Sequence, residues 1–364
     1  MSAIQDVYRT TTSGNSATRR WIIRGSLAIA VFIAIRWGIW NAVFMSSSPD
    51  VCRAANGACW AVITSQWKLV LFGTYPFAAI WRPFAATVVL LAAFAVPLVR
   101  PSLRVLASNW AGGLVTAIAL LDGRPFGLPV VETHDWGGIP LTLLLSEGTI
   151  LLAFPLGLAV ALARNSGSVV LRSLALVAVE CIRGVPLVSL LFFATLVMPL
   201  FLSGLSNLDK LSAAAGAIVL FNAAYVSEII RGGLSTVPRG QFEAAESLGV
   251  RWITMQRLIV LPQALKVCAP SLVNEAVGIV KDTSLVAVIG LLDLMNASKL
   301  TLIDVRWERY FVEVYLVIGL AYFLMCSAVA SLGRRLSARL DTAAPLQNDS
   351  ASIMLSAAAA GGQA

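Results

Sequence analysis

Long apolar runs recur along the chain and set its class before any motif is considered. A bilayer core about 30 Å thick is crossed by a helix of about 20 apolar residues. The runs are continuous and do not alternate, which is typical of membrane helices and not of a barrel. We therefore predict an all-α polytopic membrane protein with about eight transmembrane helices, at 22–45, 83–99, 102–121, 139–163, 173–202, 211–230, 266–293 and 310–332.

Composition supports this prediction and narrows the classes of partner. Of the 364 residues, 58% are hydrophobic and only 13% are charged, whereas soluble domains are about one quarter charged. The net charge of +8 does not indicate a nucleic-acid-binding protein, because Lys and Arg lie at the ends of the apolar runs and form no basic block. This distribution follows the positive-inside rule of membrane proteins, so we expect lipid as the surroundings and no nucleic acid as a partner.

The basic residues also predict an orientation. Four arginines precede or open the first run, and further basic residues fill the turns after the second, fourth, sixth and eighth runs. Short basic loops stay in the cytoplasm. We therefore expect a multi-pass membrane protein with both termini cytoplasmic.

Changes in composition divide the chain into four parts. Residues 1–20 are expected to be a cytoplasmic segment, and 21–135 an extension with three transmembrane helices and a periplasmic loop. The stretch 123–138 is rich in Gly, Pro and acidic residues and ends that extension. A core follows at 136–336 with a cytoplasmic loop at 231–265, and 337–364 is expected to be a disordered cytoplasmic tail.

Two cysteines, Cys52 and Cys59, lie together in the first outer loop. An oxidising space outside the membrane would favour a disulfide between them, and two free thiols are an equally good interpretation of the sequence. The single histidine, His134, has no set of metal ligands or nucleophile beside it. We expect no metal site, no cofactor and no catalytic site.

The loop between the sixth and seventh spans carries the strongest local signal. Pro238 and Gly240 are followed by good helix formers up to Leu248, and Gly249 is well placed to end that helix. A second helix is predicted at 251–260, with Trp252, Met255, Leu258 and Ile259 on one side, and Leu261-Pro262 is predicted to end it. Two short helices joined at a glycine would present an apolar face suited to a groove on another protein.

The spacing of this loop resembles the EAA signature of ABC-importer permeases. The matching positions are Glu243, Ala244, Ala245, Gly249, Ile259, Leu261 and Pro262. The resemblance implies that the loop forms coupling helices seated on an ATPase subunit. Without a partner, the same loop would be an amphipathic surface hairpin.

Further motifs extend the resemblance over 136–336 and point to the polar or general L-amino-acid branch of that family. They are Trp136-Gly137-Gly138, Glu180-x-x-Arg183-Gly184-x-Pro186, Ser227 to Gly233, and Lys281-Asp282-Thr283-Ser284-Leu285. The resemblance implies a location in the bacterial inner membrane and a five-helix core. It also implies three partners: a homodimeric ATPase, a periplasmic amino-acid-binding protein and a second permease subunit. A related subunit is expected as that second permease, and a second copy of this chain is the lesser alternative.

Charged residues inside the spans are costly and often functional. Glu180 and Arg183 are three residues apart and are expected to form a structural pair. Glu275 and Asp282 are seven apart and so share one helix face. With Thr283, Ser284 and Asn222 they are our candidates for the substrate path, where two carboxylates would favour cationic or broad amino-acid substrates. The alternative is a network that fixes contacts between subunits.

The chain contains no GxxxxGK[ST] sequence, so it is not expected to hydrolyse ATP itself. The favoured interpretation is the permease subunit of an ATP-driven importer that moves L-amino acids by alternating access. An ion-coupled secondary transporter is the alternative, and it would need inverted repeats that the sequence does not show. A third interpretation, a membrane-anchored enzyme or scaffold, is disfavoured because the sequence shows no set of catalytic residues.

Overall fold

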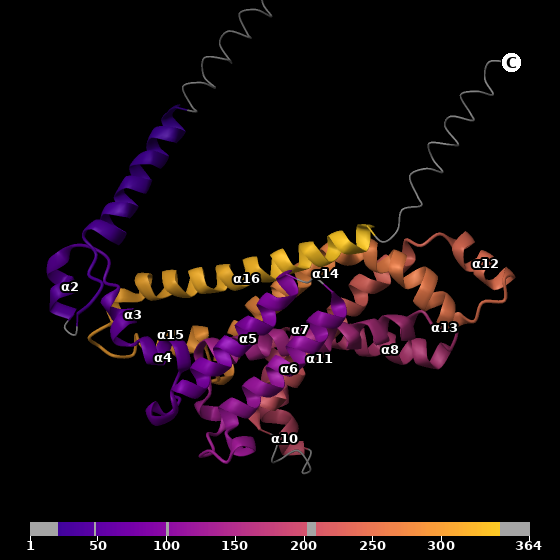
Figure 1. Ribbon diagram of the computed structural model, residues 1–364, viewed down its shortest axis with the longest axis horizontal. Coiled ribbons are helices and arrows are strands. Elements are labelled where there is room, and N and C mark those ends of the chain that lie inside the picture. The colour runs from indigo at the N-terminus through magenta and orange to yellow at the C-terminus, as the bar shows by residue number, and fades with distance from the viewer. Residues whose placement is uncertain (1–20, 47–48, 100–101, 202–208, 343–364) are drawn as a thin grey trace, which may run out of the picture. The chain divides into compact units, whose positions relative to one another are not determined.

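The computed structural model describes residues 21–46, 49–99, 102–201 and 209–342, and these are predominantly helical (Figure 1). The expected N-terminal segment 1–20 and residues 343–364 of the expected tail lie outside them. The chain forms two compact units, one of residues 1–67 with 300–317 and one of residues 68–299 with 318–364. Each unit is described by itself.

The larger unit contains the helices that correspond to the expected core and part of the extension. Its main elements are α5 (Trp81–Val99), α6 (Leu103–Asp122), α7 (Gly138–Arg164), α8 (Val169–Arg183), α9 (Leu187–Phe192), η5 (Phe193–Val197), α10 (Met198–Phe201), α11 (Lys210–Ser235), α12 (Arg239–Ser247), α13 (Trp252–Met255), η7 (Gln256–Val260), α14 (Leu261–Asp282), η8 (Thr283–Ile289), β1 (Leu292–Asp293) and α15 (Leu294–Leu300). The last helix, α16 (Phe311–Thr342), begins in the smaller unit and continues in the larger one.

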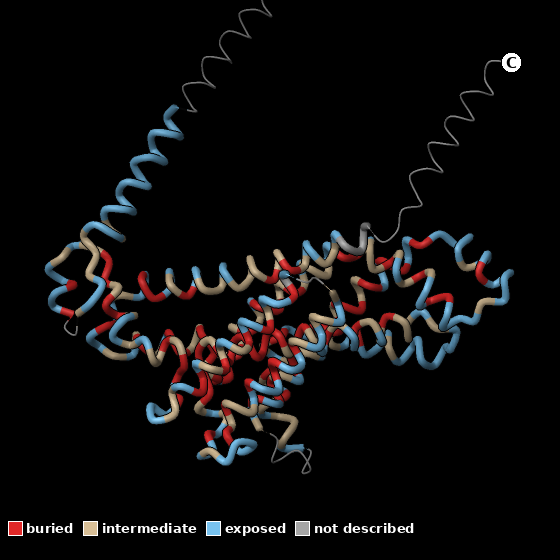
Figure 2. The backbone as a smooth tube through the Cα atoms, viewed as in Figure 1, coloured by how far each residue is buried: buried red, intermediate tan, exposed pale blue. Residues whose placement is uncertain are grey.

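Helices α7 and α11 form the centre of the larger unit and pack closely on each other. Small residues permit the close approach: a Cβ at Gly157 of α7 would lie 2.6 Å from Cγ1 of Val226 on α11. In the same way, a Cβ at Gly233 of α11 would lie 2.6 Å from the carbonyl oxygen of Ala264 on α14. Small residues at helix contacts are typical of membrane bundles. Figure 2 shows buried residues concentrated along these central helices, whereas α12 is mostly exposed.

Helices α5 and α6 of the expected extension pack against α7, so residues 68–135 belong to the same compact unit as the core. The compact units therefore do not follow the expected boundary at 135. The two extension helices also lie close to each other, since a Cβ at Gly113 would be 2.7 Å from Cβ of Ala93.

A buried arginine holds the end of α6. Arg82 is 1% exposed, and its guanidinium donates to the carbonyl oxygens of Leu120, Leu121 and Pro129 at 2.6, 2.7 and 2.8 Å. The Tyr75 hydroxyl donates to the Leu121 carbonyl as well, at 2.9 Å. The carbonyls of Leu120 and Leu121 are among those that a helix leaves free at its C-terminus, and these donors satisfy them.

Three backbone segments meet at the start of α7. Gly137 and Gly138 form isolated parallel bridges with Leu292 and Asp293. On the other side, a Cβ at Gly138 would lie 2.0 Å from the carbonyl oxygen of Leu71. The absence of side chains at 137 and 138 allows the segment before the extension helices, the first core helix and β1 to meet.

Each of the eight predicted spans overlaps a helix, but the spans differ in how well they could cross a membrane, and the first, predicted at 22–45, is helical only as far as Trp40. Five described helices are long and apolar enough: Trp21–Trp40, Leu103–Asp122, Gly138–Arg164, Lys210–Ser235 and Glu308–Ala338. The predicted span 173–202 is a bent pair, Val169–Arg183 and Leu187–Phe201, with an angle of 103° at the break. If that pair is one span, the described residues hold up to six.

The two remaining predicted spans are less regular. The predicted span 83–99 lies on a shorter apolar helix, Trp81–Pro97. The predicted span 266–293 is covered by α14 and then by the 3-10 helix η8. Helix α16 extends to Thr342 and so continues past the expected end of the core at 336.

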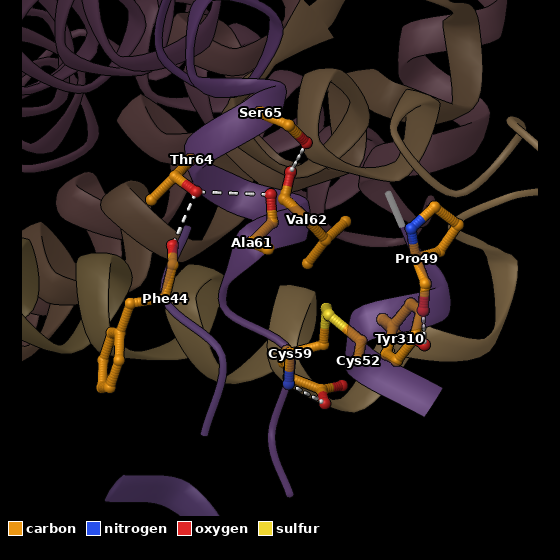
Figure 3. The surroundings of a disulfide bond; sticks show 10 residues. Phe44, Pro49, Cys52, Cys59, Ala61, Val62, Thr64, Ser65 and Tyr310 are labelled. Atoms are coloured by element: carbon orange, nitrogen blue, oxygen red, sulfur yellow. Dashed lines mark hydrogen bonds between the residues drawn. A yellow bond between two sulfur atoms is a disulfide. The ribbon is translucent and has the colours of Figure 1, made fainter. Parts of the chain in front are cut away.

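The smaller unit is built around the cysteine loop (Figure 3). Cys52 on α2 (Pro49–Ala55) forms a disulfide with Cys59. The Cys59 N–H donates a 2.9 Å hydrogen bond to Oε1 of Glu313, and the Tyr310 hydroxyl donates to the Pro49 carbonyl at 3.4 Å. The loop is thus fastened to the segment 300–317. Of the two interpretations of the cysteines, the structure contains the disulfide.

Candidate functional site

The predicted helix–glycine–helix loop is present and projects from the larger unit (Figure 1). Helix α12 covers Arg239–Ser247 and contains Glu243, Ala244 and Ala245. Gly249 follows with φ of +68°, and nothing would lie within 4 Å of a Cβ there. The glycine is therefore required by the left-handed backbone conformation that ends the helix, and not by lack of space.

One side of the loop packs onto the ends of the spans. Ala245, Met255 and Val260 are buried in one apolar cluster with Ile230 and Leu234 of α11. Ile259 lies partly buried against the same cluster, and Glu243 and Ala244 are exposed. A movement of the loop would therefore be transmitted directly to the end of α11.

The other side of the loop is an exposed apolar edge. Its members are Leu248, Trp252, Ile253 and Leu258, with 82, 43, 69 and 67% of their surface exposed. The prediction that Trp252, Met255, Leu258 and Ile259 share one outward face was therefore partly wrong. Met255 and Ile259 turn inward, and Leu248 and Ile253 take their places on the exposed edge.

The prediction that Leu261-Pro262 ends the second helix was also wrong. Helix α13 continues through the π-helical turn η7 into α14, and Pro262 lies in the first turn of α14. Because the helix is continuous there, the π-helical turn directly before Pro262 is what accommodates a residue without an N–H, since its hydrogen-bond pattern departs from that of the α-helix. Leu261 is half-buried and Pro262 is exposed.

The structure brings three of the five candidate path residues together. Asn222, 1% exposed on α11, donates through Nδ2 to the Ile218 carbonyl at 2.9 Å and lies near the Asp282 carboxyl on α14. Glu275 interacts electrostatically with Asp282, as expected for one helix face. The hydroxyls of Thr283 and Ser284 instead donate to backbone carbonyls three residues earlier, those of Val280 and Lys281, both at 2.8 Å.

Arg183 does not pair with Glu180 as predicted. Its Nη1 lies 3.7 Å from Oε2 of Glu228 on α11, and its guanidinium stacks over the ring of Tyr225 at 5.3 Å. Glu180 is exposed and interacts electrostatically with Arg231 instead. Spacing along one helix showed that Glu180 and Arg183 were neighbours, but it could not show that a carboxylate on another helix was better placed.

Sequence reasoning missed two carboxyl groups in the spans. Glu228 accepts from several arginines, and Glu147 on α7 is 2% exposed with no hydrogen-bond partner for either carboxyl oxygen among the described residues. A charged residue inside an apolar run was the available signal for both.

Comparison with known proteins identifies the family of the chain. The family of binding-protein-dependent transport system inner membrane components matches residues 153–342. The chain belongs to this family. It is therefore a multi-pass inner-membrane protein of a transport system, as the sequence predicted.

Two similar relatives cover most of the chain. The inner membrane amino-acid ABC transporter permease protein YhdY of Escherichia coli is 36% identical over 85% of this chain and 84% of its own. The glutamate/glutamine/aspartate/asparagine transport system permease protein BztC of Rhodobacter capsulatus is 35% identical over 79% of this chain and 81% of its own. A crystal structure of an amino acid ABC transporter with histidines is 33% identical, covers 55% of this chain and 90% of its own, and has a TM-score of 0.48.

Proposed function

We propose that this chain is a permease subunit of an ATP-driven importer of L-amino acids of polar or broad specificity, and that the loop 231–265 docks on its ATPase. The exposed apolar edge of Leu248, Trp252, Ile253 and Leu258 carries the proposal. Charged or polar residues would be expected on a cytoplasmic loop without a partner, whereas apolar side chains suit insertion into a groove.

The proposed assembly contains three further components that supply the functions this chain lacks. ATP binding and hydrolysis belong to a homodimeric ATPase, since the sequence has no P-loop. A periplasmic binding protein delivers the substrate, and a second, related permease subunit completes the path. Both termini of this chain lie in the cytoplasm, so that the coupling loop faces the ATPase.

Polar and general L-amino acids are the proposed substrates. The two relatives are named for amino-acid transport, one of them for glutamate, glutamine, aspartate and asparagine. In this chain, Glu275, Asp282 and Asn222 would line the path and receive the substrate's ammonium group. The electrostatic interaction between the two carboxyls and the contact of Asn222 with Asp282 support their grouping.

Docking is tested by copurification of the ATPase subunit in mild detergent. Leu248→Glu is expected to reduce the recovered ATPase at least tenfold, because it places a charge in the apolar edge. Ile303→Glu is the matched control, since Ile303 is similarly exposed, at 72%, in the smaller unit. Normal ATPase recovery and normal transport with Leu248→Glu would refute the docking proposal.

The substrate path is tested separately, in proteoliposomes with the binding protein. Glu275→Gln and Asp282→Asn are expected to lower uptake of a panel of amino acids, cationic ones most, while ATP hydrolysis persists. Normal uptake of every amino acid by both variants would remove these carboxyls from the path and leave them as residues that fix helix contacts.

A further inference from the structure

One carboxylate joins the ends of three helices in the larger unit. Oε1 of Glu228 accepts from Nε of Arg231 at 2.9 Å. Oε2 accepts a hydrogen bond from Nη1 of Arg164 and faces Nη1 of Arg183 at 3.7 Å. We call these four residues the Glu228 cluster.

The arginines of the Glu228 cluster come from different elements. Arg164 is the last residue of α7, Arg183 is the last residue of α8, and Arg231 lies one turn after Glu228 on α11. The side chains of Arg164 and Glu228 are only 8 and 22% exposed. Ion pairs that are withdrawn from water hold their geometry better than surface pairs.

The cluster is adjacent to the coupling loop in the chain and in space. From Glu228, α11 runs about two turns to its end at Ser235, and α12 begins at Arg239. The end of α11 shares an apolar cluster with Ala245 and Met255 of the loop, and Ala161 of α7 lies in that cluster as well. The loop, α11 and α7 therefore form one packed body at this end.

The contact with α8 is weaker than the contact with α7. Arg183 approaches Glu228 only to 3.7 Å, and its guanidinium stacks over the ring of Tyr225 on α11 at 5.3 Å. Its Nε is buried without a hydrogen-bond partner among the described residues. It lies directly before Gly184, where the chain bends by 103° toward α9. Helix α8 is therefore joined to Glu228 by a longer contact than α7 is.

We propose that Glu228 is a positioning residue that transmits movement of the coupling loop to α7 and α8. When the loop moves with the ATPase, α11 carries Glu228 with it. The short contact with Arg164 moves α7 together with α11, and the longer contact with Arg183 pulls on α8 at the bend. The inference rests on the proposed docking of the ATPase at the loop.

The test uses the complete transporter in proteoliposomes, with uptake and ATP hydrolysis measured on the same preparation. Glu228→Gln is expected to retain the ATPase subunit and ATP hydrolysis, and to lower uptake per ATP at least tenfold. Glu228→Asp keeps the charge and is expected to restore part of the coupling. Glu308→Gln, which changes an exposed carboxylate in the smaller unit, is the matched control.

Two further variants keep the proposal open to refutation if Glu228→Gln does not assemble. Arg164→Gln is expected to uncouple uptake from hydrolysis more strongly than Arg183→Gln, because its contact is closer. Wild-type uptake per ATP in Glu228→Gln, or in both arginine variants, overturns the proposal. Failure of the docking proposal would be seen differently, as normal ATPase recovery together with normal transport in Leu248→Glu.

Discussion

The hydroxyl of Tyr322 donates a 3.0 Å hydrogen bond to Oδ2 of Asp293. Asp293 is fully buried and also accepts from the backbone N–H groups of Met295 and Asn296, each at 3.0 Å. It thereby caps the start of α15 while it holds α16. The Thr142 hydroxyl accepts from the Leu294 N–H at 2.9 Å and donates to the Gly138 carbonyl at 3.1 Å, so the residue after Asp293 is tied to the junction at the start of α7.

Tyr322→Phe is expected to lower stability by about 1–3 kcal/mol, because a buried carboxyl loses one of its donors. Thermal unfolding in detergent measures the effect. Tyr315→Phe is the control, since Tyr315 lies on the same helix and is 43% exposed. Equal stability of the two variants would show that the Tyr322 hydrogen bond contributes little.

Gly123→Ala is expected to destabilise the larger unit by more than the cost of placing an alanine in a left-handed backbone conformation. Gly123 has φ of +90°, and a Cβ there would lie 2.3 Å from Nη2 of Arg82, whose guanidinium caps α6. Gly127→Ala is a matched control, because Gly127 has φ of +65° and no atom within 4 Å of its Cβ position. Conformational strain of about 1–3 kcal/mol is common to both. The additional loss of melting temperature in Gly123→Ala reports the clash with Arg82.

Replacing both Cys52 and Cys59 with Ser is expected to destabilise the smaller unit by about 2–3 kcal/mol, since their bond closes a short loop in the unfolded chain. Faster proteolysis between residues 41 and 66 measures this loss. Alkylation followed by mass spectrometry tests the bond in the natural protein. Both cysteines should resist alkylation until reductant is added. Labelling of Cys52 and Cys59 without reductant would contradict the disulfide.

Glu147→Met is expected to leave stability unchanged or to raise it by about 1–3 kcal/mol, because it removes buried polar atoms that make no hydrogen bond. Glu313→Met is the opposite case. Glu313 is 5% exposed, but it accepts from the Cys59 N–H, so its loss leaves a donor unpaired. Thermal unfolding of the two variants compares them. If Glu147→Met is as damaging as Glu313→Met, Glu147 has a partner in the assembled transporter.

The features predicted best from the sequence are those that depend on nearby residues. Apolar runs located the spans, and the short spacing from Glu243 to Gly249 located the turn between the coupling helices. Features that depend on packing were not predicted. The continuous helix through Pro262 needs the π-helical turn before it, and the partner of Arg183 is on another helix.

The Glu228 cluster also combines a local contact, which the sequence could predict, with a contact that depends on packing. Glu228 and Arg231 were within the motif that indicated the family, and their pairing at three residues apart is a local property. Arg164 is 64 residues away along the chain, and only the close packing of α7 on α11 brings it to the same carboxylate.

The glycine junction at the start of α7 has a consequence for how the chain can be divided. Leu71 fills the space that a side chain at 138 would need, and β1 fills the space beside 137. A shortened chain that begins at Trp136 would keep its coupling loop and its Glu228 cluster, yet would uncover the backbone at 137 and 138. The residues before the core are thus an integral part of its folded surface, and removing them would require a new covering for the first turn of α7.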